Sequence, residues 1–342
     1  MEEGTELISR LIKGAGPMPM FTSCCPGWVD YAEKRYHDLL PHLSTTKSPQ
    51  QIQGAVTKTY WAKLMNLEPK NIFHLSVMPC TAKAWEARRD RNMQVSGADD
   101  IDMVITTREL AMVIKQFGID FAALDECAAD SPLGPYSGAG TIFGATGGVM
   151  EAAVRTAYAV VEGKELADLN FTPARGLNAV KEAALTLGGK EVRIAVIHQL
   201  GNVDDVVQKV RQALAEKKEP PYHFIEVMAC RGGCVAGGGQ PYGVVDEVRE
   251  KRAAALYRDD TACAVRTSHG NPLVQELYAK FLKEPNSHEA LRTRWRRLST
   301  RSRRRDWEVR LLSARLPAWV CVRTSRQWKS WRPIWNPLST AM

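Results

Sequence analysis

The sequence lacks any apolar run long enough to cross a membrane, and this absence excludes a protein anchored by helical spans. Such helices need roughly 18 or more uninterrupted apolar residues, and none occurs here. The first residues, M-E-E-G-T-E-L, are acidic and lack the basic-then-apolar layout of a secretory signal. The chain also shows no internal repeat and no long linker before residue 286. We therefore expect a cytoplasmic globular protein, or an organellar one in a eukaryotic host.

The net charge of +8 comes from one end of the chain, so it is weak evidence for nucleic-acid binding. Residues 291–342 hold 14 Lys and Arg against two carboxylates, which leaves residues 1–290 with a net charge of −4. Six of the nine tryptophans also lie in this tail. Trp with Arg could stack on single-stranded nucleic acid. The tail composition bears no relation to the rest, and we interpret it as non-native or disordered. We expect no nucleic-acid partner and no membrane partner.

Helical and strand patterns alternate along the chain, which predicts an α/β fold. We interpret it as two lobes built on mainly parallel sheets flanked by helices, with the active site in the cleft between them. Thr106 and Asp204 are expected to cap helices. Predicted strands cover 73–78, 101–105, 192–197 and 222–228, and predicted helices cover 2–12, 29–40, 50–67, 106–117, 149–161, part of 173–187, and 204–217.

The eight cysteines favour metal binding or catalysis over disulfides, because the chain is long and lacks an export signal. The strand predicted over 222–228 ends just before Cys230 and Cys234. Five glycines lie among or after these thiols, where the backbone can approach a bulky object closely. Two thiols beside so much bare backbone suggest a large inorganic cofactor. The glycines are Gly232, Gly233, Gly237, Gly238 and Gly239.

Four soft ligands can be collected from distant parts of the chain: one of the pair Cys24 and Cys25, then Cys80, Cys230 and Cys234. Four thiolates suit either zinc or a four-iron cubane. Structural zinc usually takes its cysteines in two close pairs, whereas here 55 residues separate Cys25 from Cys80. Such a site joins whole lobes at the carboxyl ends of strands, where α/β sheets hold their ligands. We therefore favour a cluster over zinc.

Two further side chains near these ligands need an explanation. Side chains of neighbouring residues diverge, so one thiol of the pair Cys24–Cys25 would bind metal and the other would face the same cavity as a free proton donor. The alternative is a small buried hydrophobic residue. Lys83, three residues after Cys80, would be costly to bury without a negative partner such as an anionic cofactor. Its alternative is a surface lysine at a helix start.

Three motifs resemble, in order, the signatures of the [FeFe]-hydrogenase active-site domain. They are T-S-C-C-P-G-W at 22–28, M-P-C-T-A-K-A-W-E at 78–86 and E-V-M-A-C-R-G-G-C-V-A-G-G-G-Q-P at 226–241. S-P-Q-Q at 48–51 and the glycine-rich stretch 136–152 match as well. The similarity covers Met1 to about Ala290, so we expect this active-site (H-cluster) domain over 1–290, lacking its N-terminal part, followed by the tail 291–342.

The resemblance implies a cofactor and the residues that hold it. A [4Fe-4S] cubane would be bound by Cys25, Cys80, Cys230 and Cys234. Cys234 would also bridge to a [2Fe] subcluster that carries CO, cyanide and an azadithiolate. Lys83 would hydrogen-bond a cyanide, and Cys24 would pass protons to the azadithiolate amine. Pocket-lining positions of the family match Pro49, Gln50, Met78, Phe143, Gly144 and Met228.

The family's proton path also has matching residues here, which are Cys24, Glu3, Ser44, Glu6 and Arg10. Glu3 and Glu6 lie one helical turn apart on one face of the first predicted helix. An acidic first turn alone would more often reflect the helix dipole. The glycines at 138–148 follow G-x-G-x-x-x-G spacing, which does not fit the G-x-G-x-x-G dinucleotide loop.

The implied function is reversible H2 oxidation and proton reduction, with ferredoxin as electron partner and maturation proteins supplying the two-iron unit. Family members carry further active-site sequence before this point, and many carry ferredoxin-like domains that are absent here, so we interpret the chain as a fragment. The alternatives are a relative of the family's iron–sulfur assembly factors, or an inactive fragment that binds only the cubane. The free Cys24 and the glycines after Cys234 favour the hydrogenase.

Overall fold

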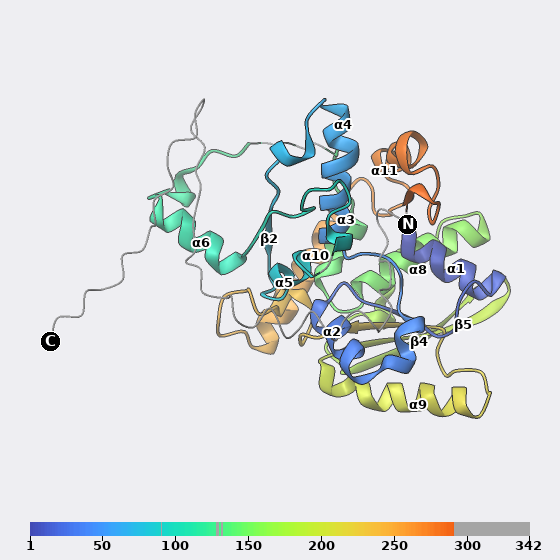
Figure 1. The fold of residues 1–342 in the computed structure, drawn as a ribbon. Coiled ribbons are helices and arrows are strands. Elements are labelled where there is room, and N and C mark those ends of the chain that lie inside the picture. Colours follow the sequence, from blue (N-terminus) through green and yellow to red (C-terminus); the bar gives the residue numbers. More distant parts are fainter. Residues whose placement is uncertain (90, 128–129, 131–132, 291–342) are drawn as a thin grey trace. The chain divides into compact units, whose positions relative to one another are not determined.

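The computed structural model describes residues 1–89, 91–127, 130 and 133–290, which all belong to one structural unit, Met1–Trp295 (Figure 1). In these ranges no helix combines the length and the apolar character that a membrane crossing requires. The interpretation of residues 291–342 as a non-native or disordered tail lies outside the described residues, as does the nucleic-acid alternative for that tail.

Four strands form the main sheet in the order β1-β6-β5-β4. Strand β6 pairs in parallel with β1 and β5, so that Phe224 lies opposite Met20 on one side and Ile194 on the other. Strand β4 runs antiparallel to β5. All five residues of β6 are buried, as expected for a central strand covered on both faces. The strands are β1 Met20–Thr22, β4 Val180–Leu187, β5 Lys190–His198 and β6 Phe224–Met228.

Helices cover both faces of the main sheet, because successive strand residues point to opposite faces. On one face α1 and α8 bury Leu7 and Val154, and on the other α2 and α9 bury Trp28 and Val207. Figure 1 shows α9 on one side of the sheet and α1 with α8 on the other. These cores fix the ends of the strands, where the cysteines lie. The helices are α1 Glu2–Lys13, α2 Pro26–Arg35, α8 Gly148–Glu162 and α9 Val203–Ala215.

A second sheet consists of β2 and β3, which pair in parallel with Met78 opposite Thr106. Thr106 forms the expected capping box, because its hydroxyl accepts from the Glu109 N–H and the Glu109 carboxylate accepts from the Thr106 N–H. The α/β class with mainly parallel sheets flanked by helices is thereby confirmed. The elements are β2 Leu75–Met78, β3 Met103–Thr106, α3 Pro49–Val56, α4 Ala62–Leu64, α5 Lys83–Ala87 and α6 Thr107–Gln116.

Further helices complete the described chain, and the longest of them, α10, packs against the glycine-rich α7. They are α7 Gly138–Thr141, α10 Asp246–Ala262 and α11 Pro272–Leu277. Short 3-10 helices occupy His37–His42, Pro69–Asn71, Arg91–Met93, Phe121–Ala123, Ile142–Gly144, Thr172–Ala174, Leu200–Asn202 and Cys234–Ala236, and π-helical turns occupy Thr57–Trp61 and Tyr278–Leu282.

The helix expected within 173–187 is wrong, because residues 180–187 form strand β4. Alternate residues from Lys181 to Leu187 differ in exposure, which is the two-residue period of a half-buried strand. Gly188 and Gly189, with φ of 59° and 75°, then turn the chain directly into β5. Two glycines between strands are a hairpin signal. That signal in the sequence would have identified β4.

Three helix boundaries also differ from expectation. Helix α9 begins at Val203 with Asn202 as its cap, so Asp204 lies inside the first turn, where its carboxylate accepts a hydrogen bond from Tyr36. Helix α2 ends at Arg35, and Pro41 lies within the following 3-10 helix instead of after a long helix. The helix predicted over 50–67 contains a π-helical turn between α3 and α4.

Candidate functional site

Three loops that carry the predicted cysteines all begin at the carboxyl ends of parallel strands. Cys24 and Cys25 follow β1, and Cys230 and Cys234 follow β6, its parallel neighbour. The two loops therefore leave the main sheet at the same edge. Cys80 follows β2 of the second sheet. The topology thus gathers loops that are far apart in the sequence, as α/β sheets do at their ligand sites.

The five sulfurs of these loops belong to one site. The thiols of Cys24 and Cys234 lie close enough to interact, which lowers the pKa of Cys24 and raises that of Cys234. Electrostatic interactions connect Cys25 with Cys230, and Cys230 with Cys80. All five cysteines are free and half-buried. The structure therefore brings the whole predicted set together, whereas Cys127 is exposed and Cys263 lies beside Tyr136 and Asp259.

Glycines allow the Cys80 loop and the Cys234 loop to pack backbone against backbone. The Gly239 N–H donates to the Pro79 carbonyl over 2.9 Å. A Cβ on Gly239 would lie 2.8 Å from the Cys80 nitrogen, and one on Gly237 would lie 2.1 Å from the Pro79 oxygen. Arg108 secures the same run from outside by donating to the Gly238 carbonyl over 2.7 Å. No side chain fits at these glycines, so the closeness of the two loops depends on them.

The donor set fits a cluster that takes one thiolate at each iron. In the described ranges, no group of three or more His, Cys, Asp or Glu side chains gathers closely enough to hold a metal ion. A single zinc needs four ligands within about 2.3 Å of one point, whereas a cubane spreads its thiolates over four corners. Burial raises the pKa of Cys25 to about 11 and also raises that of Cys230. These buried thiols need a positively charged centre before they become thiolates.

Lys83 enters the site from the start of α5, as the sequence indicated. Its ammonium donates to the Cys24 carbonyl over 2.7 Å and to the Glu86 carboxylate over 2.9 Å. Burial opposes the ammonium charge, but Glu86 together with the thiols of Cys24 and Cys234 outweighs it, so the pKa of Lys83 lies above its ordinary value. Glu86 also accepts from Ser48 over 2.8 Å. Sequence reasoning missed Glu86, although it closes the motif M-P-C-T-A-K-A-W-E.

The predicted pocket residues lie on the elements around the cysteines. Gln50 donates to the Lys83 carbonyl over 3.2 Å and accepts from Ser76 over 2.9 Å. Met78 and Met228 end β2 and β6, while Phe143 and Gly144 lie in the 3-10 turn after α7. Pro49 is exposed at the first position of α3. Five of the six are therefore at least partly buried, and Pro49 is not.

The predicted proton-path residues of α1 face the loop after β1 and the segment around Ser44. Glu3 accepts a hydrogen bond from Thr22 and lies close enough to Ser44 to interact with it, and burial raises the pKa of Glu3 above its ordinary value. Among the described residues, no direct hydrogen bond joins Cys24 to Glu3. Thr22 was not predicted and lies two residues before Cys24.

The second half of the predicted path is a buried ion pair. Arg10 donates to Glu6 over 2.6 Å, with side-chain exposures of 4 % and 7 %. The other oxygen of Glu6 accepts from the Thr45 N–H over 3.0 Å and from its hydroxyl over 2.8 Å. Thr45 directly follows Ser44, so Glu3 and Glu6 contact adjacent residues of one segment.

Glu226 is a further buried carboxylate that sequence reasoning did not identify. It lies on β6, fully buried, and accepts from the Gly147 N–H over 2.6 Å and from the Met150 N–H over 2.7 Å. Burial raises the pKa of Glu226. The two N–H groups belong to the start of α8, where a negative charge is favourable. Glu226 therefore attaches the glycine-rich segment to the strand that carries Cys230.

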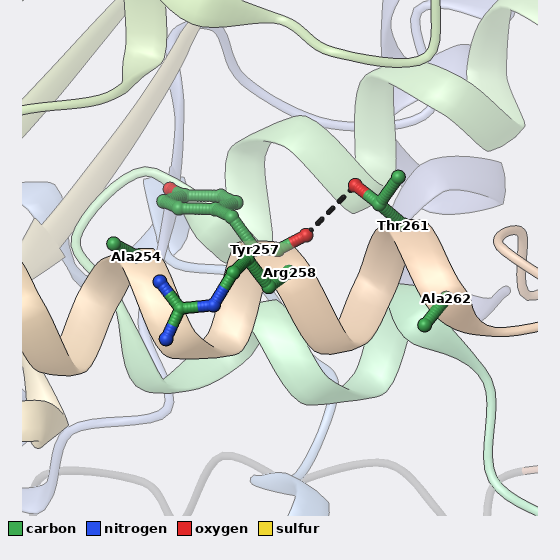
Figure 2. A pocket seen from close by; sticks show the side chains of 5 residues that line it. All are labelled: Ala254, Tyr257, Arg258, Thr261 and Ala262. Carbon is green, nitrogen blue, oxygen red and sulfur yellow. Dashed lines mark hydrogen bonds between the residues drawn. The ribbon is translucent and has the colours of Figure 1, made fainter.

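A hollow of about 630 Å³ lies elsewhere, along one side of α10 (Figure 2). Tyr257 and Thr261 are among the residues that line it, and the Thr261 hydroxyl donates to the Tyr257 carbonyl over 2.9 Å. None of the cysteines or predicted pocket residues lines it. We therefore assign the candidate chemistry to the cysteine loops and not to this hollow.

Comparisons with known proteins show which sequences the chain is similar to. Residues 1–238 match the family model described as iron only hydrogenase large subunit, C-terminal domain, and residues 246–295 match iron hydrogenase small subunit. Iron hydrogenase 1 of Clostridium pasteurianum is 47 % identical over 87 % of this chain and 52 % of its own length. Cytosolic iron-sulfur assembly component 3 of Rattus norvegicus is 34 % identical over 85 % of this chain and 61 % of its own length. The chain thus spans about half to three fifths of these relatives.

Solved structures of hydrogenases also match this chain. An [FeFe]-hydrogenase, HydA(deltaEFG), matches with a TM-score of 0.73 and 40 % identity, over 86 % of this chain and 80 % of its own. This likeness covers most of the chain and supports the α/β architecture described above.

Proposed function

This chain belongs to the iron-only hydrogenase family, and we propose that it interconverts protons and electrons with molecular hydrogen at an H-cluster. The observation that carries the proposal is Cys24. It is a free thiol outside the four-cysteine set, it interacts with Cys234 of that set, and Lys83 donates to its carbonyl over 2.7 Å. A metal-storage or purely structural cluster needs four ligands but no such fifth thiol.

We propose that Cys25, Cys80, Cys230 and Cys234 hold a [4Fe-4S] cubane and that Cys234 also bridges to a [2Fe] subcluster with CO, cyanide and azadithiolate ligands. When bound, this group supplies redox-active iron at which electrons and protons are exchanged with hydrogen. Lys83 would place its ammonium against the anionic ligands, where a desolvated positive charge is favourable. Gln50, Met78, Phe143, Gly144 and Met228 would line the pocket and exclude water, with Pro49 at its rim.

Proton movement would use the side chains on α1 and the loops facing it. Cys24 would exchange a proton at the cofactor side, and Glu3, Ser44, Glu6 and Arg10 would lead outward from it. The raised pKa of Glu3 supports this role, because burial makes the carboxylate easier to protonate than an ordinary one. One water between Cys24 and Glu3 would complete the path.

The proposed partners follow from the same chemistry. A ferredoxin-type carrier would exchange electrons with the cubane, and maturation proteins would insert the two-iron unit. The net charge of −4 over residues 1–290 supports no nucleic-acid role for the described domain. A cytoplasmic location stays a prediction.

Infrared spectroscopy of anaerobically matured protein tests the proposal. Bands of iron-bound CO and cyanide, together with hydrogen turnover, are the expected result. A cubane seen by its absorption without those bands would instead favour the assembly-factor class, to which the 34 % identity with an assembly component also points. It would equally fit an inactive cubane-binding fragment, and reconstituting the two-iron unit chemically would separate these outcomes.

A further inference from the structure

The glycine-rich wall, residues 138–148, carries the proposed pocket residues Phe143 and Gly144 but has few side chains with which to anchor itself. Its first helix, α7, contains only Gly138, Ala139, Gly140 and Thr141. A four-residue helix of this composition has little stability of its own. The position of the wall must therefore depend on the elements that contact it.

On one side the wall is attached to the cysteine-bearing strand and loop. The Thr146 N–H donates to the Gly232 carbonyl over 3.1 Å. A Cβ on Gly233 would lie 2.6 Å from the Thr146 nitrogen, so the two backbones are in direct contact next to Cys234. Glu226 of β6 accepts a hydrogen bond from the Gly147 N–H, at the end of the wall, over 2.6 Å. Movement of the wall would therefore change the surroundings of Cys234.

On the other side the wall contacts the segment that matches the small-subunit family model, residues 246–290, which we call the small-subunit-like segment. The Gly138 N–H donates to the Val265 carbonyl over 2.9 Å, and the Thr141 hydroxyl donates to Asp259 over 2.8 Å. A Cβ on Gly138 would lie 2.2 Å from an Asp260 carboxylate oxygen. Helices α10 and α7 are thus in direct contact at Asp260, and no side chain at position 138 would fit between them.

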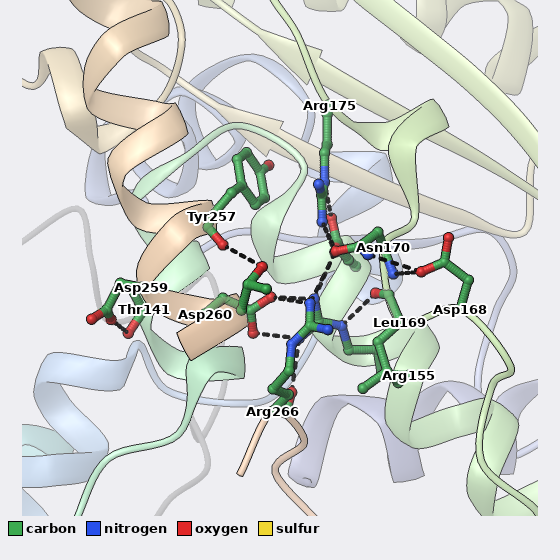
Figure 3. A network of polar contacts seen from close by, with 12 residues as sticks. Thr141, Arg155, Asp168, Leu169, Asn170, Arg175, Tyr257, Asp259, Asp260 and Arg266 are labelled. Carbon is green, nitrogen blue, oxygen red and sulfur yellow. Dashed lines mark hydrogen bonds and ion pairs between the residues drawn. The ribbon is translucent and has the colours of Figure 1, made fainter. Parts of the chain in front are cut away.

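Asp260 itself is fixed by a buried ionic network that crosses between the two family regions (Figure 3). Arg155 of α8 donates to both Asp260 oxygens, over 2.9 and 2.8 Å, and to Glu151 over 2.7 Å. These three side chains are fully buried. Arg266 adds a bond of 2.6 Å to Asp260, and Arg175 adds one of 2.6 Å to Glu151. Three guanidinium groups therefore surround two carboxylates.

We propose that Asp260 is a positioning residue through which the small-subunit-like segment sets the distance between the glycine-rich wall and Cys234. This inference rests on the proposed function only for its catalytic consequence. The physical reason is that a buried carboxylate bound by two arginines has one allowed position, and α7 rests on it without a side chain of its own. The segment is thereby part of the site's framework and not an accessory beside it.

The test compares Asp260→Asn with Glu250→Gln, an exposed charge change on the same helix, in the full-length apoprotein under anaerobic conditions. Alkylation followed by peptide mass spectrometry measures each thiol. We expect Cys234 to react several-fold faster in Asp260→Asn, while the exposed Cys127 is unchanged and the circular dichroism matches wild type. Glu250→Gln should react like wild type at every cysteine.

A second readout uses the loaded protein. Asp260→Asn should keep its four-iron content after reconstitution, because none of the four cysteines lies on α10, but should lose or shift the infrared bands of the two-iron unit after maturation. If wild type itself lacks those bands, the proposed function fails while the thiol measurement still tests Asp260.

Wild-type thiol reactivity at Cys234 in a folded Asp260→Asn protein would overturn the proposal. If Asp260→Asn does not fold, Arg266→Gln removes a single, partly exposed partner of Asp260 and takes its place. Unchanged Cys234 reactivity in that folded variant, beside a lowered thermal midpoint, would leave the network a structural role only and would equally overturn the positioning role.

Discussion

Glu86 gives the sharpest prediction, because it is the carboxylate that lets Lys83 remain charged inside the site. The side chains of Lys83 and Glu86 are only 8 % and 7 % exposed. Replacing Glu86 by Gln keeps the shape and one acceptor oxygen for Ser48 but removes the charge. The ammonium of Lys83 would then be buried without a carboxylate partner, while it still donates a hydrogen bond to the Cys24 carbonyl.

The magnitude follows from what a buried, unpaired charge costs. Removing one partner of a buried ion pair typically destabilises a protein by about 3–5 kcal/mol. Because Gln retains part of the hydrogen bonding, we expect Glu86→Gln to lower the free energy of unfolding of the apoprotein by about 2–4 kcal/mol. Removing both charges, in Lys83→Met with Glu86→Leu, should cost less than Glu86→Gln alone, because no charge is then left buried.

Urea unfolding of the anaerobic apoprotein, followed by circular dichroism, measures this difference. The matched control is Glu276→Gln, which breaks an exposed pair with Lys280 and should change stability by less than about 1 kcal/mol. In matured protein the cost of Glu86→Gln should shrink, since Lys83 then has the anionic ligands of the cofactor as partners. Equal urea midpoints for Glu86→Gln and Glu276→Gln would refute the reasoning, and an equal cost with and without cofactor would remove Lys83 from the proposed cofactor contacts.

Three other predictions concern the cysteine loops and the core beneath them. Cys24→Ser should keep its cubane and nearly abolish hydrogen turnover, whereas Cys25→Ser should lose the cubane by iron analysis; the reverse pattern would mean that the two roles are exchanged. Gly239→Ala should destabilise the apoprotein by about 1–3 kcal/mol and weaken cubane reconstitution, because its Cβ would lie 2.8 Å from the Cys80 nitrogen, while Gly201→Ala, with open space around it, should do neither. Burial lowers the pKa of Lys181 from 10.5 to about 8, so the unfolded chain binds more protons between these values and wild-type stability should rise with pH from about 8 to 10. Lys181→Met should flatten that rise by about 2–3 kcal/mol in urea titrations, and an unaltered slope would contradict the burial argument.

Local patterns in the sequence predicted most of the fold. The apolar run before Cys230 is the central strand β6, as predicted. Thr106 and Glu109 form the predicted capping box at the start of helix α6. Strand β4 was mistaken for a helix because Ala183, Ala184 and Leu185 have good helix propensity, and pairing with β5 outweighed that preference. Strand β1 has only three residues, too few for a periodic pattern, and it exists because β6 lies beside it.

The residues of the candidate site also fall into two groups, those that the sequence indicates and those that only the structure identifies. The cysteines and Lys83 could be chosen from the sequence, because their residue types and their places after strands indicate metal chemistry. Glu86 and Glu226 could not, because a glutamate near a cysteine motif is normally a solvated side chain. Their importance comes from burial and from partners 36 to 79 residues away, such as Ser48 for Glu86 and Gly147 for Glu226, which lie on other elements.

By itself, then, the sequence determined the α/β class, the family and the set of thiols, because residue type, spacing and strand periodicity are properties of short segments. Only the tertiary structure decided that Cys24 lies beside Cys234, that Glu86 accepts from Ser48, and that Asp260 meets Arg155 across 105 residues. These contacts depend on how strands are ordered in the sheets and on which charges lose their water. Neither property can be obtained from any single stretch of chain.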